Sequence, residues 1–143
     1  MNRRAFVVAM ATLGFVALAK PMVAWADPEL TEAVLGTAVN DDDKVTNPTD
    51  TFTADTPMIY CAFKIEGVEG GATIRGVWIA EDVGKVAPPN YKIDEASLKL
   101  TGDGDAKGKF SLSKPNNGFP LGKYRTEIYI GDKLAKTVTF TVK

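Results

Sequence analysis

The strongest constraint on the fold is an alternation of apolar and polar residues within short segments that turn residues separate. In residues 59–66 the apolar side chains Ile59, Cys61, Phe63 and Ile65 occupy every second position. A period of two is typical of a β-strand with one face in the core and the other toward solvent. The same pattern recurs in residues 74–80, 93–100, 109–113, 124–130 and 136–143. The sequence therefore predicts an all-β fold.

Clusters of glycine, proline, asparagine and aspartate mark the turns between these segments. Glycines are frequent in residues 67–71, 102–105 and 131–132, and Pro88-Pro89-Asn90 separates two further strands. The chain has 143 residues, of which 45% are hydrophobic, and this is enough for one packed domain. About seven short strands in roughly 100 residues predict a β-sandwich or a small barrel.

The N-terminus has the features of a cleavable signal peptide. Arg3 and Arg4 precede an apolar run over residues 5–19, and Ala24 and Ala26 form the small-x-small pattern that signal peptidase recognises. The run is shorter than the roughly 20 residues that a membrane-spanning helix needs. We expect cleavage after Ala26, a periplasmic or secreted product, and no stable membrane insertion after cleavage.

The export route stays open. Residues 2–8, with two arginines before Ala5 and Phe6, resemble the twin-arginine pattern. Asn2, Val7 and Val8 depart from the usual residues of that pattern, and two arginines also begin many general-secretion signals. The chain thus divides into a signal peptide, 1–26, and one domain, 27–143. Loss of three basic residues with the signal changes the formal net charge from −1 to −4.

Residues 27–50 allow two interpretations at their start. Asp27 and Pro28 fit the beginning of a helix over residues 28–35, whereas a strand through Ala33–Val39 fits slightly better. Residues 40–50 have no periodicity and many turn-forming residues, which predicts an acidic loop after this N-terminal strand.

The composition argues against several classes of function. The chain has no histidine and one cysteine, so the commonest general base, an intrachain disulfide and a CxxC redox pair are excluded. The 17 basic and 18 acidic residues are balanced, which argues against a nucleic-acid partner. We expect no catalytic residues, no metal site, no cofactor and no small-molecule ligand.

One segment carries a family resemblance. Pro120-Leu121-Gly122-Lys123-Tyr124 resembles the tyrosine corner of immunoglobulin-like domains. Cys61 and Trp78 resemble the core cysteine of the second strand and the core tryptophan of the third. The chain departs from the pattern at Thr126, where the second core cysteine is usual. The resemblance implies an immunoglobulin-like β-sandwich without a core disulfide, similar to bacterial exported modules of unassigned function.

Three short motifs have ordinary explanations. Ser111 and Lys114 match the S-x-x-K of penicillin-interacting enzymes, but positions three apart on a strand point to opposite faces. Residues 103–108 resemble a calcium loop, yet Lys107 stands where an oxygen ligand belongs, so we expect a hairpin turn. We expect the acidic residues 41–43 to be solvated, with a calcium site as the alternative.

The alternation also predicts a binding face on two neighbouring strands. If Trp78 and Tyr124 point into the core, alternate residues on each strand point outward, and an immunoglobulin-like sheet places the two strands side by side. The outward set is Arg75, Val77, Ile79, Arg125, Glu127 and Tyr129. We expect an apolar patch rimmed by charges, which is either a protein interface or is covered by the N-terminal segment or a loop.

These observations favour a function that involves binding rather than chemistry. We expect an exported, non-enzymatic β-sandwich that serves as a protein-interaction or accessory module of the bacterial cell envelope, with an unknown envelope protein as partner. A small envelope hydrolase or sugar-modifying accessory is one alternative. A calcium-dependent adhesive or structural module is the other.

Overall fold

The computed structural model describes residues 27–143, and every regular element in this range is a β-strand. The strands are β1 (Glu29–Gly36), β2 (Thr51–Phe52), β3 (Met58–Val68), β4 (Ala72–Asp82), β5 (Tyr91–Leu100), β6 (Gly104–Ser113), β7 (Gly122–Ile130) and β8 (Lys133–Val142). The predicted all-β fold is confirmed. The predicted signal peptide lies outside the described residues. Residues 27–143 contain no helix long and apolar enough to cross a membrane.

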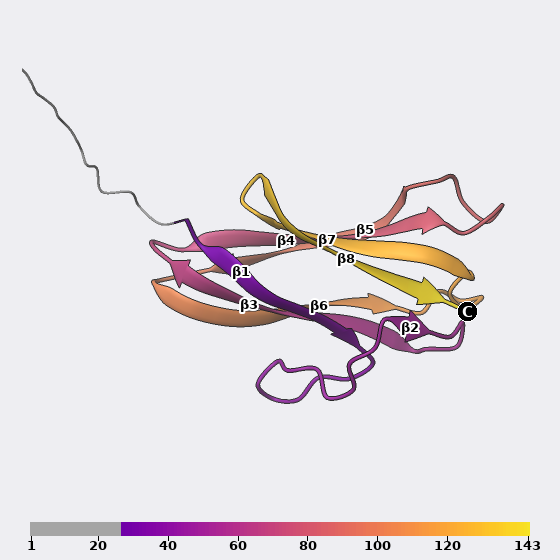
Figure 1. Ribbon diagram of the computed structural model, residues 1–143, viewed down its shortest axis with the longest axis horizontal. Helices are drawn as coiled ribbons and strands as arrows, with labels where there is room; N and C mark the ends of the chain where they lie inside the picture. The colour runs from indigo at the N-terminus through magenta and orange to yellow at the C-terminus, as the bar shows by residue number, and fades with distance from the viewer. Residues whose placement is uncertain (1–26) are drawn as a thin grey trace, which may run out of the picture.

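The strands form two sheets that pack face to face (Figure 1). One sheet has the order β1-β3-β6, and the other has the order β2-β8-β7-β4-β5. Paired strands are antiparallel except for β2 and β8, which run parallel. The two sheets remain separate, so the fold is the predicted sandwich and not a barrel.

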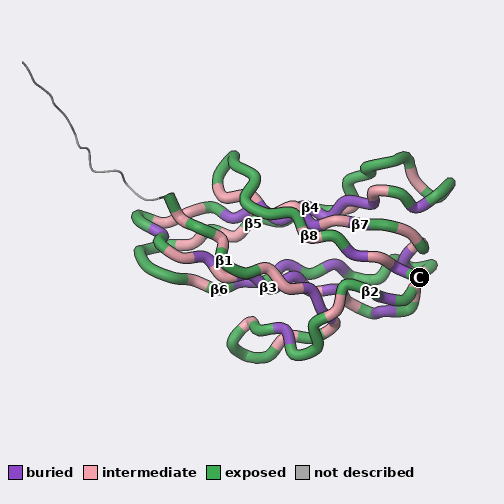
Figure 2. The backbone as a smooth tube through the Cα atoms, viewed as in Figure 1, coloured by how far each residue is buried: buried purple, intermediate pink, exposed green. Residues whose placement is uncertain are grey.

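The core lies between the sheets, and Figure 2 shows buried residues on both layers, alternating with exposed and intermediate ones. Alternation places Ile59, Cys61, Phe63 and Ile65 of β3 in this core, as the sequence predicts. Residues between them on β3 are partly or wholly turned toward the outer face. Burial of such apolar side chains contributes about 1.5–3 kcal/mol for each large residue and is the main force that holds the sheets together.

Phe140 of β8 is the centre of an aromatic cluster in the core. Its ring stacks on Tyr124 with 5.1 Å between the ring centroids. It also meets Phe52 and Trp78 edge to face, with centroid distances of 5.6 and 6.0 Å. Aromatic pairs in these arrangements contribute about 0.5–1.5 kcal/mol beyond their buried area. The cluster therefore fixes β2, β4, β7 and β8 relative to one another.

Residues 29–36 form the strand β1, so the helix alternative for this segment is wrong. The strand also begins and ends before the predicted range of 33–39. A β-bulge between Leu30 and Glu32 shifts the pairing with β3, and Leu30 and Ala33 both pack against the core. Because the bulge breaks the period of two, the sequence gives no clear strand pattern here.

The structure contains one more strand than the seven that the sequence predicts. The additional strand, β2, has two residues and pairs with the far end of β8, Thr51 with Thr141 and Phe52 with Val142. Two residues are too few to show a periodic pattern, and the partner strand is distant in sequence. Only the folded arrangement reveals this pairing.

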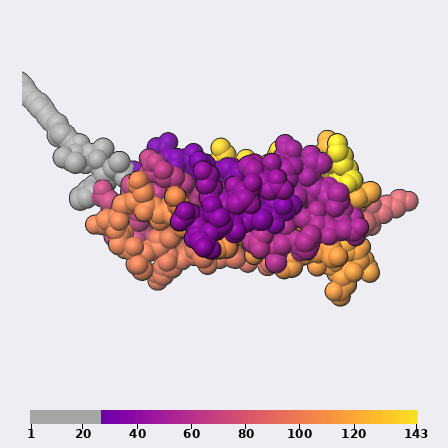
Figure 3. Space-filling view, turned by 90° about the horizontal axis from the view of Figure 1, so that it is seen from below, coloured from indigo at the N-terminus to yellow at the C-terminus, as the bar shows by residue number. Residues whose placement is uncertain are grey.

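The predicted acidic loop is confirmed as a loop, and it lies against the outer face of the three-stranded sheet (Figure 3). Within the loop the Val45 side chain is buried, and the Asp43 carboxylate accepts a hydrogen bond from Lys109 Nζ of β6 at 2.7 Å. This hydrogen bond and the charge of Asp43 raise the pKa of Lys109. Asp41 and Asp42 are exposed, so the acidic run is only partly solvated.

Candidate functional site

The predicted binding face lies on the outer surface of β4 and β7, which are neighbours as the sequence predicts. Opposite positions on the two strands are Arg75 and Tyr129, Val77 and Glu127, and Ile79 and Arg125. Trp78 and Tyr124 point into the core, which confirms the predicted orientation of both strands. The six residues of the predicted face therefore share one side of the sheet.

Arg125 is the centre of a polar network on this face. Its Nε donates to Glu127 Oε2 at 2.9 Å, and its Nη1 donates to Asn90 Oδ1 at 2.7 Å and to Glu81 Oε2 at 3.3 Å. The Tyr129 hydroxyl donates to the other Glu127 oxygen at 2.9 Å. Burial alone would raise the pKa of Glu127, but the hydrogen bonds from Arg125 and Tyr129 outweigh it and lower the pKa.

A second set of contacts continues the network toward the edge strand β5. The Arg75 guanidinium lies 4.1 Å from the centre of the Tyr129 ring, in a cation–π arrangement. Arg75 and Lys92 both form ion pairs with Glu95 of β5. The Lys92 hydrogen bond and charge are the main reason that the pKa of Glu95 is lowered. Charged side chains therefore cover the face from β7 to β5.

The expectation of an exposed apolar patch on this face is wrong. Val77 and Ile79 are only 4% and 7% exposed. Val77 lies between Glu95 of β5 and Glu127 of β7, and Arg125 lies opposite Ile79. The long polar side chains of the adjacent strands, held together by ion pairs, cover the two apolar side chains. The face presents charges to solvent and does not present an apolar patch.

The short sequence motifs form neither a catalytic nor a calcium-binding arrangement. Ser111 lies on strand β6, as the sequence predicts, and not on the helical turn that S-x-x-K chemistry requires. Asp103 accepts a hydrogen bond from the Gly70 backbone N–H at 2.7 Å, and Asp105 accepts one from Gly67 at 3.4 Å. Between residues 27 and 143, no three acidic or cysteine side chains gather where they could hold a metal ion.

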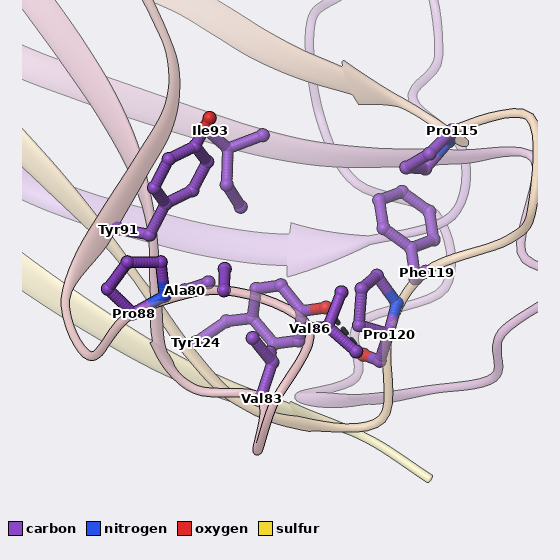
Figure 4. Close-up of a pocket in the computed structure, with 11 residues that line it drawn as sticks. Ala80, Val83, Val86, Pro88, Tyr91, Ile93, Pro115, Phe119, Pro120 and Tyr124 are labelled. Carbon is purple, nitrogen blue, oxygen red and sulfur yellow. Dashed lines mark hydrogen bonds between the residues drawn. The ribbon is translucent and has the colours of Figure 1, made fainter.

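A cavity of about 320 Å³ opens at one end of the sandwich, between the loops 83–90 and 114–121. Ala80, Val83 and Tyr124 form the part of its wall that belongs to the core. Figure 4 shows the 11 lining residues, none of which carries a charge.

Two residues of the cavity wall, Val86 and Tyr91, are exposed, as is Leu121, which follows the lining residue Pro120 in the chain. Val86, Tyr91 and Leu121 are 69%, 51% and 61% exposed, and all three lie in or beside the two loops. Among the described residues, the other large exposed hydrophobic side chain is Leu134, at the start of β8. Figure 1 shows the two loops at the end of the molecule away from β1's first residues. We call the cavity together with Val86, Tyr91 and Leu121 the loop-end surface.

The loops of this surface are basic, although the described chain as a whole is acidic. They contain Lys85 and Lys114 and no acidic residue. Neither lysine forms an ion pair with any described residue. The loop-end surface therefore combines apolar groups with two lysines that form no ion pair among the described residues.

Solved structures share this two-sheet arrangement. An immunoglobulin-like protein from Pseudomonas aeruginosa matches with a TM-score of 0.54 and 16% identity, over 85% of this chain and 100% of its own. The fold is an immunoglobulin-like β-sandwich. β-Glucosidase 3B from Thermotoga neapolitana and a β-glucosidase from Erythrobacter marinus both have TM-scores of 0.52, at 14% and 8% identity, but the match spans only 16% and 15% of those chains. Neither a protein-family model nor a curated protein matches the sequence.

The immunoglobulin-like features predicted from the residues are present in the structure. The Tyr124 hydroxyl donates a hydrogen bond to the Pro120 carbonyl, which forms the predicted tyrosine corner. Cys61 is buried as predicted, and burial raises the pKa of its thiol to about 12. Thr126 stands at the position of the second core cysteine, fully buried, with no hydrogen-bond partner for its hydroxyl in the described part of the chain.

The loop-end surface is not among the sites that the sequence predicts. Residues 83–90 and 114–121 were interpretable only as turns, because their glycine, proline and asparagine content is typical of turns. The signal that distinguishes them is the presence of large apolar residues, Val86, Phe119 and Leu121, within such turn sequences.

Proposed function

We propose that this chain is an exported, non-enzymatic interaction module of the bacterial cell envelope, which binds a partner protein through the loop-end surface. The observation that carries the proposal is the exposure of Val86 and Tyr91, which line an uncharged cavity, and of Leu121, which follows the lining residue Pro120 in the chain. Contiguous exposed apolar groups mark interaction sites on soluble proteins. Loops held at one end of a rigid sandwich are also the usual place for binding residues.

The sequence of residues 1–26 supports the export part of this proposal, and substitution of the two N-terminal arginines tests it. Replacement of Arg3 and Arg4 by lysine blocks export if the twin-arginine route is used, and normal export of this variant assigns general secretion. On either route we expect the exported protein to begin at Asp27, which its intact mass shows. An exported product that retains residues 1–26 would contradict the predicted signal peptide.

The binding part is tested by site-specific photocrosslinking in intact cells. A benzoylphenylalanine side chain at Tyr91 should form an adduct with the partner, which mass spectrometry then identifies. The same probe at Leu134, which is also exposed but lies on β8, is the matched control. We expect the Tyr91 adduct to disappear in a Val86→Asp background. Equal adducts at the two positions, or an adduct unaffected by Val86→Asp, would overturn the assignment of the binding surface.

A further inference from the structure

We infer that the loop-end surface binds an acidic peptide segment of the partner protein, with one bulky apolar side chain of that segment seated in the cavity. The inference rests on the proposed function and specifies the chemistry of the partner. Three properties of the surface lead to it: the size of the cavity, the small number of polar groups in its wall, and the charge around it.

The size of the cavity sets the size of the group that enters it. Its volume of about 320 Å³ is at the lower end of the range of about 300–1,000 Å³ that is usual for ligand sites. One aromatic or large aliphatic side chain fits this volume. Val83, Phe119 and Tyr124 in the wall are buried members of the core, so the cavity is formed before a ligand arrives. A preformed site loses little conformational entropy on binding.

The wall offers few hydrogen-bonding partners to a ligand. The Tyr124 hydroxyl already donates to the Pro120 carbonyl (Figure 4). Pro88, Pro115 and Pro120 line the cavity and have no backbone N–H to donate. A polar group that entered would lose its hydration and find few hydrogen-bonding partners in return, which is unfavourable. The group that occupies the cavity is therefore apolar.

The charge of the loops determines what flanks this apolar group. Lys85 and Lys114 are the chain neighbours of Val86 and Pro115, which line the cavity. Three acidic residues, Glu81, Asp82 and Asp94, are also chain neighbours of lining residues, but the basic neighbours outnumber them. These are Lys85, Lys92, Lys114, Lys123 and Arg125. The excess of positive charge around the cavity favours aspartate and glutamate in the partner. Charge complementarity of this kind accelerates association and excludes basic partners.

A peptide uses this surface more completely than a small amphiphile does. The tail of a fatty acid would fill the cavity and contact Val86 and Tyr91 in its wall, but it would leave Leu121, which does not line the cavity, exposed. A peptide that continues on both sides of its apolar side chain covers these groups as well. Exposed tyrosine beside a pocket is a frequent centre of binding energy in protein interfaces.

Two probe peptides and one fatty acid test the inference on the purified, ¹⁵N-labelled protein. The acidic probe is acetyl-EDEWEDE-amide, and the basic probe is acetyl-KRKWKRK-amide. We expect the acidic peptide to shift amide resonances of residues 83–93 and 114–124 in a saturable manner. Its Kd should rise about tenfold or more when its tryptophan is replaced by alanine. It should also rise several-fold between about 50 and about 500 mM NaCl, because salt screens exposed charges.

Matched variants separate the surface from the rest of the domain. Val86→Asp places a charge at the cavity without disturbing the core, and we expect it to abolish binding. Leu134→Asp, at an exposed apolar position on β8, should bind as the wild type does. Lys85→Glu should weaken binding about three- to tenfold, whereas Lys136→Glu on β8 should leave the Kd within about twofold.

Each remaining outcome contradicts the inference. Equal or tighter binding of the basic peptide would reject an acidic partner. If octanoate shifts the same amide resonances while neither peptide binds, a peptide ligand is rejected. If the protein forms a dimer that Val86→Asp dissociates, the surface belongs to an interface with a second copy of the chain. If photocrosslinking at Tyr91 succeeds and no peptide binds up to about 5 mM, only the partner chemistry is overturned. If the crosslink at Tyr91 also fails, the proposed function fails with it.

Discussion

Replacement of Thr126 by valine is expected to stabilise the protein. The Thr126 side chain is 0% exposed, and its hydroxyl has no hydrogen-bond partner in the described structure. A buried hydroxyl without a partner costs about 1–3 kcal/mol, because it loses hydration on folding and gains nothing in return. Valine has the same branched shape and replaces this hydroxyl by a methyl group, so it fits the site without repacking.

The magnitude follows from the loss of this cost. We expect the free energy of unfolding to rise by about 1–2 kcal/mol. This is the lower part of the range given above for a buried hydroxyl without a partner, because the substitution exchanges only one heavy atom. For a domain of this size the Tm should rise by about 4–8 °C. Thr126→Ser keeps the unpaired hydroxyl and loses the buried methyl, so it should lower the free energy of unfolding by about 1 kcal/mol.

Urea unfolding followed by the fluorescence of the buried Trp78 measures both changes, with an unchanged m-value as the sign that only stability differs. Thr137→Val, at an exposed position of β8, is the control for the change of residue type and should lie within about 0.5 kcal/mol of wild type. A destabilised Thr126→Val would refute the reasoning, because it would mean that the hydroxyl is satisfied in the folded protein.

Three other predictions concern the core and the outer network. Tyr124→Phe removes the tyrosine-corner hydrogen bond to Pro120 and should lower the free energy of unfolding by about 1–2 kcal/mol in the same urea assay; an unchanged value would show that the bond contributes nothing. Cys61 is buried and its thiol pKa is raised to about 12, so iodoacetamide should label it only after denaturation, and rapid labelling of the native protein would contradict its burial. The pKa of Glu127 in the folded protein is lowered from 4.5, so the ionised carboxylate stabilises the fold at neutral pH. This contribution to the free energy of unfolding is lost as the pH falls below about 4.5 and the carboxylate is protonated. The difference in stability between wild type and Glu127→Gln should therefore shrink between pH 7 and pH 3, and a constant difference would show that the Arg125 contact does not hold the carboxylate.

The fold was predictable wherever alternation is uninterrupted. β3, β7 and β8 bury alternate apolar residues and turn more polar residues outward, so their sequences specify both strand and orientation. In β4 the alternation of Ile74, Trp78 and Ala80 specifies the core face, although Val77 and Ile79 of the other face are buried as well. β1 was not clear because its bulge shifts the period at Leu30, and β2 was not visible because two residues carry no period. These exceptions depend on pairing between distant segments, which a local pattern does not encode.

The candidate site was less predictable, for a related reason. Alternation tells which face a residue lies on, and Val77 and Ile79 do lie on the predicted face. It does not tell how far the neighbouring side chains extend, and Arg125 and Glu127 cover these positions. The loop-end surface forms where two loops that are separate in sequence meet at one end of the sandwich. Their proximity is a product of the sheet topology.

The parallel pairing of β2 with β8 has a consequence for when this protein can fold. Thr51 and Phe52 find their partners in Thr141 and Val142, and Phe140 occupies the aromatic cluster. The ribosome therefore releases most of the chain before the five-stranded sheet can close. A signal at residues 1–26 would emerge long before that moment and meet its receptor on an unfolded chain. General secretion can use the time before β8 is synthesised, because it exports an unfolded chain. The twin-arginine route exports a folded protein and must therefore wait for β8. Synthesis of this last strand sets the earliest time at which the twin-arginine route can operate.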